Sequence, residues 1–503
     1  MSINIYEEIK RLLQFGVSKK LIEPLDLDFT KNAVLDVLGL DEWQDTEVEA
    51  EELSSPVPIL EKILDWAAEN GRLEENTVTY RDLLDTRIMG QFVARPSEVI
   101  KIFNHTYKKM GPKEATKYLY KLSQESNYIR TDRIAKNEHW YAHTEYGDLE
   151  ITINLSKPEK DPKAIAAAKH LKESNYPSCL LCKENVGYAG RVNHPARQNL
   201  RTIPFELEGE IWHLQFSPYV YYQEHAIMFL GEHIPMVISK RTFDRILEFV
   251  DILPHYFLGS NADLPIVGGS ILSHDHYQGG YHDFPMGKAE IETEFMFEEY
   301  PEVKAGIVKW PMSVIRLQGH NREQISELAD IILSKWRAYS DDTIDIHANT
   351  GETAHNTITP IARRNGELFE LDLVLRNNRT NDEHPLGIYH PHNEVHHIKK
   401  ENIGLIEVMG LAVLPGRLQE ELKLLADALL SDDVSEIIRA DERIAKHHDW
   451  ALEIKSNYPD LTNYHEVLKK EVGKVFSTIL EHCGVFKRDK QGQEAFLKFL
   501  KSV

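Results

Sequence analysis

Five consecutive residues near the middle of the chain, His274 to Gln278, combine side chains that could carry out covalent chemistry. They read His-Asp-His-Tyr-Gln, with a glycine pair on either side and an apolar run upstream. An apolar run followed by a short segment between glycines predicts a β-strand bounded by turns. Because alternate side chains of a strand share a face, His274, His276 and Gln278 are expected to point one way. Asp275 and Tyr277 would then point the other way.

The chemistry open to this row is limited by its residue types. An imidazole can attack a phosphorus atom and hold the phosphoryl group covalently. A carboxamide two residues further on can donate to phosphoryl oxygens but, unlike a histidine, cannot activate water. The intermediate would survive until a second substrate arrives, so the row favours nucleotidyl transfer over hydrolysis. The alternative interpretation is a set of ordinary polar strand residues on a solvated face.

Two of the three cysteines, Cys179 and Cys182, stand at metal-ligand spacing. A tetrahedral zinc site needs four soft or borderline ligands, and His225 and His274 are the candidates for the other two. With all four positions filled by protein, the zinc is expected to be structural and to fix the strand of His276 against that of His225. A redox pair or coincidence is the alternative, although no thioredoxin-like βαβ pattern surrounds the cysteines.

A second group of histidines lies further along the chain, as His390, His392, His396 and His397 with Glu394 among them. It contains another His-x-His, but the position two residues on is a carboxylate rather than an amide. Histidines with a carboxylate suit a metal or a polar interface better than a phosphoryl-binding row. A solvated, histidine-rich turn is the other interpretation.

The sequence patterns around these residues predict an α+β fold with antiparallel sheets and flanking helices, which would hold the reactive side chains in place. Apolar residues recur at helical spacing at both ends of the chain, and alternating, β-branched and aromatic segments fill the middle. A short helix is expected over 164–171. We expect four segments. They are a helical accessory region (1–125), a catalytic half with both motifs (126–300), a second sheet-containing half (301–418) and a C-terminal helical region (419–503).

Composition narrows the class of protein and its partners. The 503 residues are 42% hydrophobic and 27% charged, which is typical of a globular protein larger than one ordinary core. The formal net charge of −22 argues against nucleic acid or an anionic membrane as partner. The chain begins directly with an amphipathic helical pattern and has no apolar stretch long enough to span a bilayer, so a cytoplasmic location is expected.

Several stretches together resemble the galactose-1-phosphate uridylyltransferases, specifically the class found in low-GC Gram-positive bacteria. The resemblance runs over nearly the whole chain and is most specific from Pro254 to Gly280. It implies a histidine-triad-like fold of two related halves. A homodimer is a separate expectation, which no motif of the sequence specifies. The segments that carry it are Ile151–Lys160, Cys179–Asn185, Pro254–Ser270, His274–Gln278 and Gly404–Gly410.

The resemblance implies a ping-pong exchange between UDP-glucose and galactose 1-phosphate. His276 would be the nucleophile that takes UMP, and Gln278 the residue that binds the phosphoryl group. Cys179, Cys182, His225 and His274 match the zinc ligands of the better-known class. That class has proline where this chain has Asp275, a difference that should leave the nucleophile intact because the side chain faces away. No hexose-binding residue can be carried over.

Substrate contacts are predicted at four further residues. Arg130 and Arg133 resemble the family's phosphate-binding arginine pair, and arginine suits bidentate phosphate contact, although a surface charge is the alternative interpretation of each. Asn261 and Asp263, on the approach to the histidine strand, could meet the uridine or ribose, although turn formation explains them equally well.

Two other functions are alternatives to nucleotidyl transfer. One is a dinucleoside-polyphosphate phosphorylase or hydrolase with the same histidine chemistry. The other is a non-catalytic zinc-stapled binding protein, which would not need Gln278.

Overall fold

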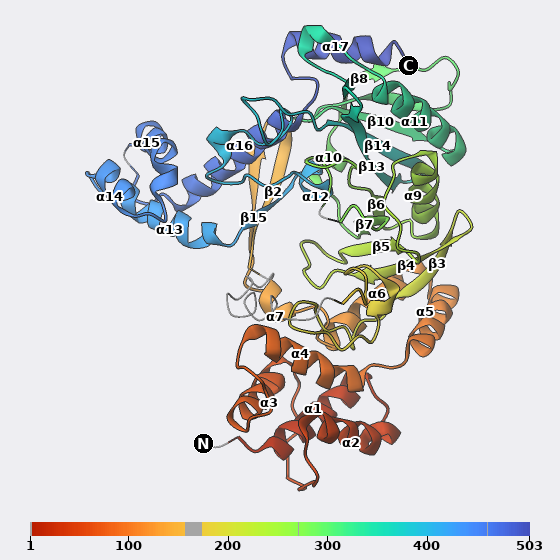
Figure 1. Ribbon diagram of the computed structural model, residues 1–503, viewed down its shortest axis with the longest axis vertical. Helices are drawn as coiled ribbons and strands as arrows, with labels where there is room; N and C mark the ends of the chain where they lie inside the picture. Colours follow the sequence, from red (N-terminus) through yellow and green to blue (C-terminus); the bar gives the residue numbers. More distant parts are fainter. Residues whose placement is uncertain (1–2, 156–173, 270, 460) are drawn as a thin grey trace. The chain divides into compact units, whose positions relative to one another are not determined.

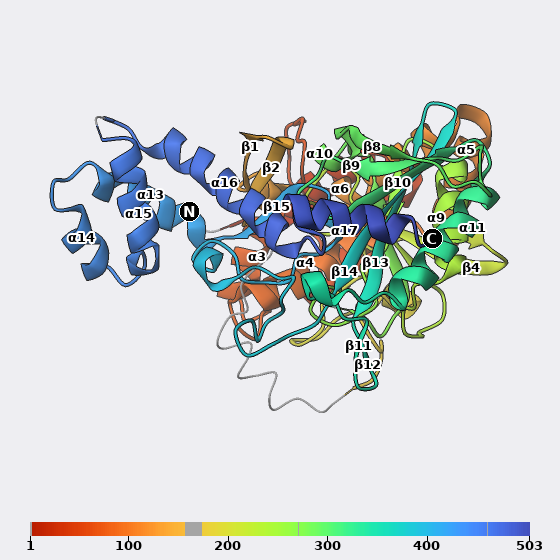
Figure 2. The same cartoon turned by 90° about the horizontal axis from the view of Figure 1, so that it is seen from above.

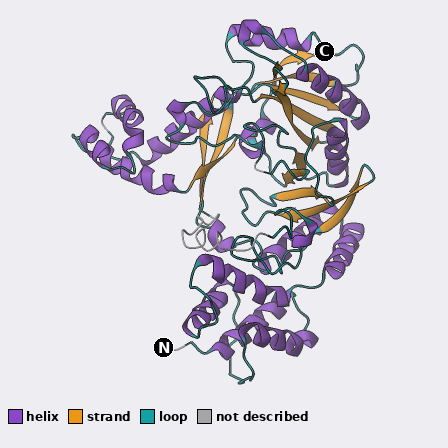
Figure 3. Cartoon of the chain, in the orientation of Figure 1, coloured by secondary structure: helices purple, strands orange, loops and turns teal. Residues whose placement is uncertain are grey.

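The computed structural model describes residues 3–155, 174–269, 271–459 and 461–503 (Figure 1). The fold is α+β, with largely antiparallel sheets flanked by helices, as the sequence predicted (Figure 3). By their contacts the residues form two compact units. Unit 1 comprises Met1–Lys136 and Ser156–Ile234, and unit 2 comprises Asn137–Leu155 and Pro235–Val503.

The four segments expected from sequence are divided by the type of secondary structure, whereas the two units are divided by contacts between residues. The two divisions are not the same quantity, so the expected segment boundaries stay a prediction. The difference arises because residues 137–155 pack with strands from much later in the chain. The short helix expected over 164–171 lies outside the described residues.

Unit 1 begins with amphipathic helices that share one apolar core. Ile9 and Leu12, which stand at helical spacing, are fully buried there together with Val34 and Ile63. The helices of this core are α1 (Ile5–Ser18), α2 (Leu27–Leu38), α3 (Val57–Glu69) and α4 (Val78–Met89). They are followed in the chain by α5 (Pro96–Met110), α6 (Pro112–Glu125) and α7 (Thr131–Ile134).

Three antiparallel strands complete unit 1, in the order β3 (Ile203–Leu207), β4 (Glu210–Phe216) and β5 (Ala226–Leu230). The buried side chains Trp212 and Leu214 alternate along β4 with residues that are more exposed, as expected for a sheet with one covered face.

Unit 2 is built on antiparallel strands in the spatial order β7-β6-β13-β14-β10-β9-β8. The helices α9 (Lys240–Ile252) and α11 (Arg322–Arg337) pack on each other and on β13, so they cover one face of the sheet (Figure 1). The strands are β6 (Phe257–Gly259), β7 (His276–Gly280), β8 (Ile291–Phe295), β9 (Lys304–Val308), β10 (Val314–Gly319), β13 (Asn356–Asn365) and β14 (Leu368–Asn377).

A separate three-stranded sheet of unit 2 joins distant parts of the sequence. In it β2 (Gly147–Asn154) pairs antiparallel with β1 (Glu138–Thr144) and parallel with β15 (Leu411–Pro415). Helix α16 (His465–Cys483) runs beside β1 (Figure 2). The remaining elements of unit 2 are β11 (Asn349–Thr350), β12 (Thr353–Ala354), α10 (Pro285–Lys288), α12 (Leu405–Val408), α13 (Arg417–Leu429), α14 (Val434–Ala440), α15 (His448–Asn457) and α17 (Lys490–Leu500).

Helix α16 confirms the helical spacing expected at the C-terminal end of the chain, since its apolar stripe of Leu468, Val472, Phe476 and Ile479 is buried. No helix within the described residues combines the length and apolarity needed to cross a membrane.

Candidate active site and metal cluster

The expected histidine strand is β7, which begins at His276 and pairs antiparallel with β6. His276 and Gln278 are two residues apart within the strand, so their side chains leave it on the same face. His274 precedes the strand by two residues. A Cβ atom at Gly279 would lie 2.5 Å from the carbonyl oxygen of Phe257, so glycine lets the two strands approach.

The imidazole of His276 is oriented by the main chain. Its Nδ1 lies 2.8 Å from the carbonyl oxygen of His274, and since a carbonyl only accepts, Nδ1–H is the donor. In the neutral ring this tautomer leaves the lone pair on Nε2. Burial lowers the pKa of His276, although the hydrogen bond to the carbonyl opposes the shift. The ring is therefore a neutral imidazole with Nε2 available as a nucleophile.

Gln278 places a carboxamide on the same face of β7. Its side chain is half-buried, and Oε1 is a buried atom without a hydrogen-bond partner among the described residues. The amide can rotate to present its NH₂ group at that position instead. A buried polar group of this kind costs free energy unless a ligand satisfies it. A role of Gln278 in binding a phosphoryl group stays a prediction.

The opposite face of β7 is held by a buried arginine of α9. Arg245 Nη1 lies 3.3 Å from Asp275 Oδ2 and 3.4 Å from the hydroxyl oxygen of Tyr277. All three side chains are buried. The predicted alternation is thus confirmed for Asp275 and Tyr277, which both turn toward α9 while His276 and Gln278 occupy the other face.

In unit 1, three ligand-type side chains gather in one cluster. The Sγ atoms of Cys179 and Cys182 are 3.5 Å apart, and Cys182 Sγ lies 3.1 Å from Nδ1 of His233. The side chain of Asn185 donates to the carbonyl oxygens of both cysteines at 2.8 Å, and the Leu181 amide donates to Cys179 Sγ. These contacts shape the loop so that both sulfurs face the same point.

The donor set fits a zinc ion. Two thiolates on one tetrahedral zinc would be about 3.8 Å apart, given zinc–sulfur bonds of ~2.3 Å. The thiols are free rather than joined in a disulfide. Burial raises the pKa of Cys179 to about 11, so without a cation that sulfur keeps its proton. Two sulfurs and an imidazole are typical ligands of structural zinc.

His233 was missed by the sequence interpretation, which chose His225. His225 is buried against the rings of Tyr221 and Tyr222, with Nδ1 3.4 Å from the Tyr219 carbonyl oxygen, and it is not among the clustered donors. His233 follows the end of β5, where the chain turns after Gly231. A histidine directly after a strand was the available signal, but spacing from the cysteines could not rank it above His225.

The predicted phosphate-binding arginines are already paired with carboxylates. Arg130 Nη1 lies 2.5 Å from Asp85 Oδ2, and Arg133 binds both oxygens of Asp82 at 2.5 and 2.9 Å. A phosphate would have to compete with these buried or half-buried carboxylates. A substrate role for either arginine stays a prediction, and the contacts favour a structural one.

Asn261 and Asp263 also make structural contacts. The side-chain oxygen of Asn261 accepts from the Leu405 amide at 2.9 Å. Asp263 accepts from the Ile238 amide at 2.9 Å and from the Thr357 hydroxyl at 2.5 Å. Their proposed contacts with uridine or ribose stay predictions, and the turn-forming alternative is the one that these bonds favour.

The second group of histidines spreads over different contacts instead of converging. His392 stacks on His482 with ring centroids 4.1 Å apart, away from the partners of the others. His390 and His396 share the Pro391 carbonyl, at 3.2 and 2.8 Å, and His390 also contacts the side chain of Asn402. The ring of His397 contacts that of His447 instead.

His392, Glu394 and His482 do bring donor atoms within 4.8 Å of one another. The backbone N–H of His392, however, donates to Nδ1 of His482 at 3.3 Å. Burial lowers the pKa of His482 to about 4, so the ring is neutral and its proton lies on Nε2, 3.4 Å from Glu394. An N–H that faces a carboxylate is not a metal ligand, so these contacts favour the polar interface.

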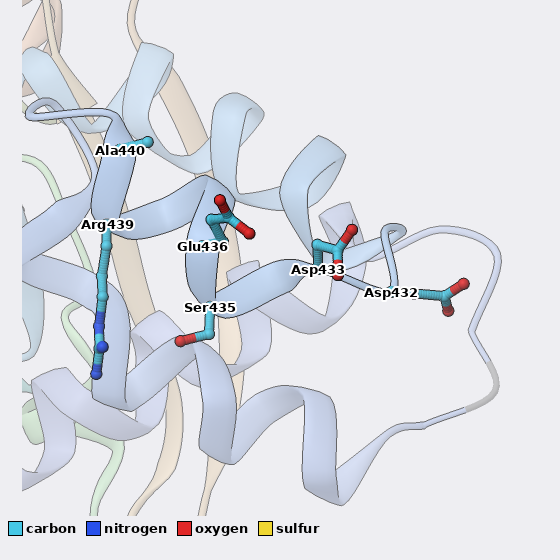
Figure 4. A pocket seen from close by; sticks show the side chains of 6 residues that line it. All are labelled: Asp432, Asp433, Ser435, Glu436, Arg439 and Ala440. Atoms are coloured by element: carbon cyan, nitrogen blue, oxygen red, sulfur yellow. The ribbon is translucent and has the colours of Figure 1, made fainter.

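A hollow of about 610 Å³ lies on α14, far in sequence from both motifs. Figure 4 shows its polar side chains spread along the helix and the preceding turn, pointing in different directions. Asp432, Asp433 and Glu436 are all exposed there, and the lining residues include no histidine or cysteine. The hollow therefore offers no competing catalytic arrangement.

The fold and the two sites together define a class: α+β proteins that present a candidate histidine nucleophile beside a carboxamide and carry a cysteine–histidine cluster. Profiles of galactose-1-phosphate uridyl transferase match this chain, the N-terminal domain at residues 20–235 and the C-terminal domain at 248–452. The chain belongs to the galactose-1-phosphate uridylyltransferase family.

Curated relatives match the chain from end to end. The galactose-1-phosphate uridylyltransferase of Halalkalibacterium halodurans is 64% identical over 99% of this chain and 98% of its own length. That of Bacillus subtilis is 58% identical over the same shares, and that of Fusobacterium nucleatum is 53% identical over 98% of each chain. A solved yeast Ap4A phosphorylase aligns with 60% of this chain and 88% of its own, at 13% identity and a TM-score of 0.31.

Proposed function

We propose that this protein transfers UMP from UDP-glucose to galactose 1-phosphate through a covalent intermediate on His276. The observation that carries the proposal is the imidazole whose Nδ1–H is bound to its own strand, which leaves Nε2 as the nucleophile. The curated relatives, which bear the uridylyltransferase name at 48–64% identity, favour this reaction over dinucleoside-polyphosphate phosphorolysis. A non-catalytic role would leave the carboxamide of Gln278 unexplained.

The exchange has two steps. Nε2 of His276 attacks the α-phosphorus of UDP-glucose, the phosphorus–nitrogen bond forms, and the bond to the bridging oxygen breaks with release of glucose 1-phosphate. A phosphate oxygen of galactose 1-phosphate then attacks the same phosphorus, the phosphorus–nitrogen bond breaks, and UDP-galactose leaves. Gln278, on the same face of β7, donates to the phosphoryl oxygens as charge develops. The imidazole regains its lone pair, so the cycle closes.

The test is the mass of the intact protein after exposure to UDP-glucose without acceptor. We expect an added mass of one UMP, lost again when galactose 1-phosphate is supplied. His276→Ala should show no adduct, whereas His213→Ala, which removes a half-buried histidine of β4, should label normally. An adduct on His276→Ala would exclude this nucleophile. Release of the adduct by inorganic phosphate instead of hexose 1-phosphate would favour the phosphorylase.

We infer in addition that Cys179, Cys182, His233 and His274 form the ligand set of a structural zinc ion. Three of them already gather in unit 1, and His274, a buried histidine in the predicted ligand position, supplies the fourth. When bound, zinc would contribute a fixed tetrahedral crosslink, since protein would fill every position. His274 would at the same time hold the carbonyl that orients the His276 ring.

Zinc content separates the two candidate histidines. Purified wild-type protein is expected to contain one zinc per chain by elemental analysis. His233→Ala should lose most of it, and the matched variant His225→Ala should retain it. If His233→Ala retained its zinc and His225→Ala lost it, His225 would be the zinc ligand instead of His233.

We infer a cytoplasmic enzyme that acts on small phosphorylated sugars, forms a homodimer and does not bind nucleic acid. The net charge of −22 supports the last point, because a polyanion would be repelled by the surface. Light scattering tests the assembly: a mass near twice 58.0 kDa is expected, and a monomer would contradict it.

A further inference from the structure

The outer side of helix α5 carries exposed lysines, although the chain as a whole has a formal net charge of −22. Lys101, Lys108 and Lys109 are exposed, and none of them forms an ion pair with another described residue. Lys101 and Lys108 are seven residues apart, so they lie on the same side of the helix. Ile102 and Met110 add exposed apolar surface, at 40% and 66%. We call these five residues the lysine face.

The positive charge of the lysine face has no internal explanation. Two lysines of the neighbouring helix α6 are paired with glutamates of their own helix, at 3.6 and 3.8 Å. Cations in the last turn of a helix are stabilised by its dipole, which accounts for Lys108 and Lys109. Lys101 stands in the middle of α5, where the dipole has no such effect. The lysine face therefore suits a partner that is acidic.

A segment of opposite sign lies in the same unit, between α2 and α3. Residues 41–52, which we call the acidic segment, contain seven carboxylates and no lysine or arginine. Two of the carboxylates are paired with α1, since Lys10 lies 2.8 Å from Asp45 and Arg11 lies 2.7 Å from Glu51. The other five are exposed and form no ion pair within the part of the chain that the structure describes: Asp41, Glu42, Glu47, Glu49 and Glu52.

The acidic segment is anchored to its own helices although it forms no helix or strand. The ring of Trp43 packs edge-on against that of Tyr6 in α1, with centroids 5.7 Å apart. Nζ of Lys31 in α2 lies 5.4 Å from the centroid of the Trp43 ring. These contacts and the two ion pairs hold the segment in place, so binding would order little additional chain.

Electrostatics decide how two copies of this chain can associate. Net charges of −22 repel each other, so a contact between copies is favoured where opposite signs meet at short range. At physiological ionic strength charges are screened over about 8 Å, and local pairs then outweigh the distant charge. In a two-fold symmetric dimer, a contact between the lysine face and the acidic segment would form twice.

We propose that the lysine face binds the acidic segment of a second copy of this chain. The inference rests on the homodimer proposed above and specifies the surfaces that form it. The unpaired carboxylates would pair with the lysines, and Val48 and Ala50 of the segment can meet Ile102 and Met110. Both surfaces belong to unit 1 and are separate in sequence from the His276 motif.

Sedimentation of the full-length protein over a concentration series tests this contact. Lys108→Glu/Lys109→Glu reverses the lysine face, and Glu47→Lys/Glu49→Lys reverses the acidic segment. Each double variant is expected to dimerise roughly tenfold more weakly or worse, because like charges then meet at both contacts. A mixture of the two variants should dimerise like the wild type, because every reversed surface then meets its opposite sign.

Lys335→Glu/Lys501→Glu is the matched control. It reverses two exposed lysines at the C-terminal ends of α11 and α17 in unit 2, and should dimerise normally. A wild-type dimer that both reversals leave intact would overturn the contact, while the homodimer itself would stand. A mixture that fails to restore dimerisation would also overturn it. A wild type that stays monomeric at every concentration would overturn the homodimer and the contact together.

Discussion

At the scale of single residues, the candidate nucleophile is oriented by its own backbone. The carbonyl of His274 fixes the tautomer of His276, so no neighbouring acidic side chain is needed for that purpose. The position of one main-chain carbonyl therefore decides which ring nitrogen is nucleophilic. The orientation of the His276 ring therefore depends on the backbone conformation between His274 and His276, rather than on a partner side chain.

Gln278 is expected to protect the covalent intermediate from water. Replacing it by histidine supplies a ring that can act as a general base toward a water molecule. We predict that Gln278→His still forms the uridylyl adduct but hydrolyses it, so UMP accumulates from UDP-glucose without acceptor. The measurement is UMP release by chromatography over time. A variant that forms a stable adduct and releases no UMP would show that other features keep water away.

At the scale of elements, β7 is fixed between β6 and the arginine of α9. The buried Arg245–Asp275 pair stabilises the strand on the face opposite to His276. Removing one member of a buried ion pair costs about 3–5 kcal/mol, because the other charge remains buried. We predict that Asp275→Asn lowers the free energy of unfolding by about 3 kcal/mol in denaturant titration, while the variant still forms the UMP adduct.

A surface carboxylate of the same helix provides the control for this prediction. Asp251 of α9 lies 3.7 Å or more from its arginine partners and is largely exposed. Asp251→Asn should change stability by less than about 0.5 kcal/mol. Equal effects of the two substitutions would mean that the buried pair has no special role. Complete loss of labelling in Asp275→Asn would mean that this pair also sets the nucleophile's position.

The sequence predicted these elements better than it predicted contacts between them. Alternation around His276 and the helical stripe of α16 are local patterns, and both are confirmed. The choice between His225 and His233 depends on where the loop after β5 turns, which no periodicity encodes. Arg130 and Asp85 are 45 positions apart in the sequence, so their ion pair could not be predicted from any local pattern.

At the scale of the whole molecule, the contacts of one buried carboxylate join segments that are remote in sequence. Glu150 of β2 is 1% exposed, and both of its oxygens lie 3.0 Å from Nε2 of His282, which follows β7 closely. His139 of β1 approaches the same carboxylate at 3.4 Å. The three-stranded sheet of unit 2 is in this way connected to the segment that carries the candidate nucleophile.

This carboxylate should make stability depend on acid. Burial alone would raise the pKa of Glu150, but the hydrogen bonds from His139 and His282 outweigh it and lower the pKa to about 2. A carboxyl whose pKa is lower in the folded state stabilises the fold above its unfolded pKa near 4.5, and that contribution is lost as the pH falls toward 2. The shift corresponds to roughly 3 kcal/mol at neutral pH.

We therefore predict that Glu150→Gln is less stable than the wild type at pH 7, and that the difference shrinks as the pH is lowered from 4.5 toward 2. The measurement is the denaturation midpoint at a series of pH values. Glu145→Gln, at the exposed turn of the same hairpin, should follow the wild-type curve throughout. If the gap between Glu150→Gln and wild type stayed constant down to pH 2, ionisation of this carboxylate would not be what stabilises the sheet, and shape alone would explain the loss.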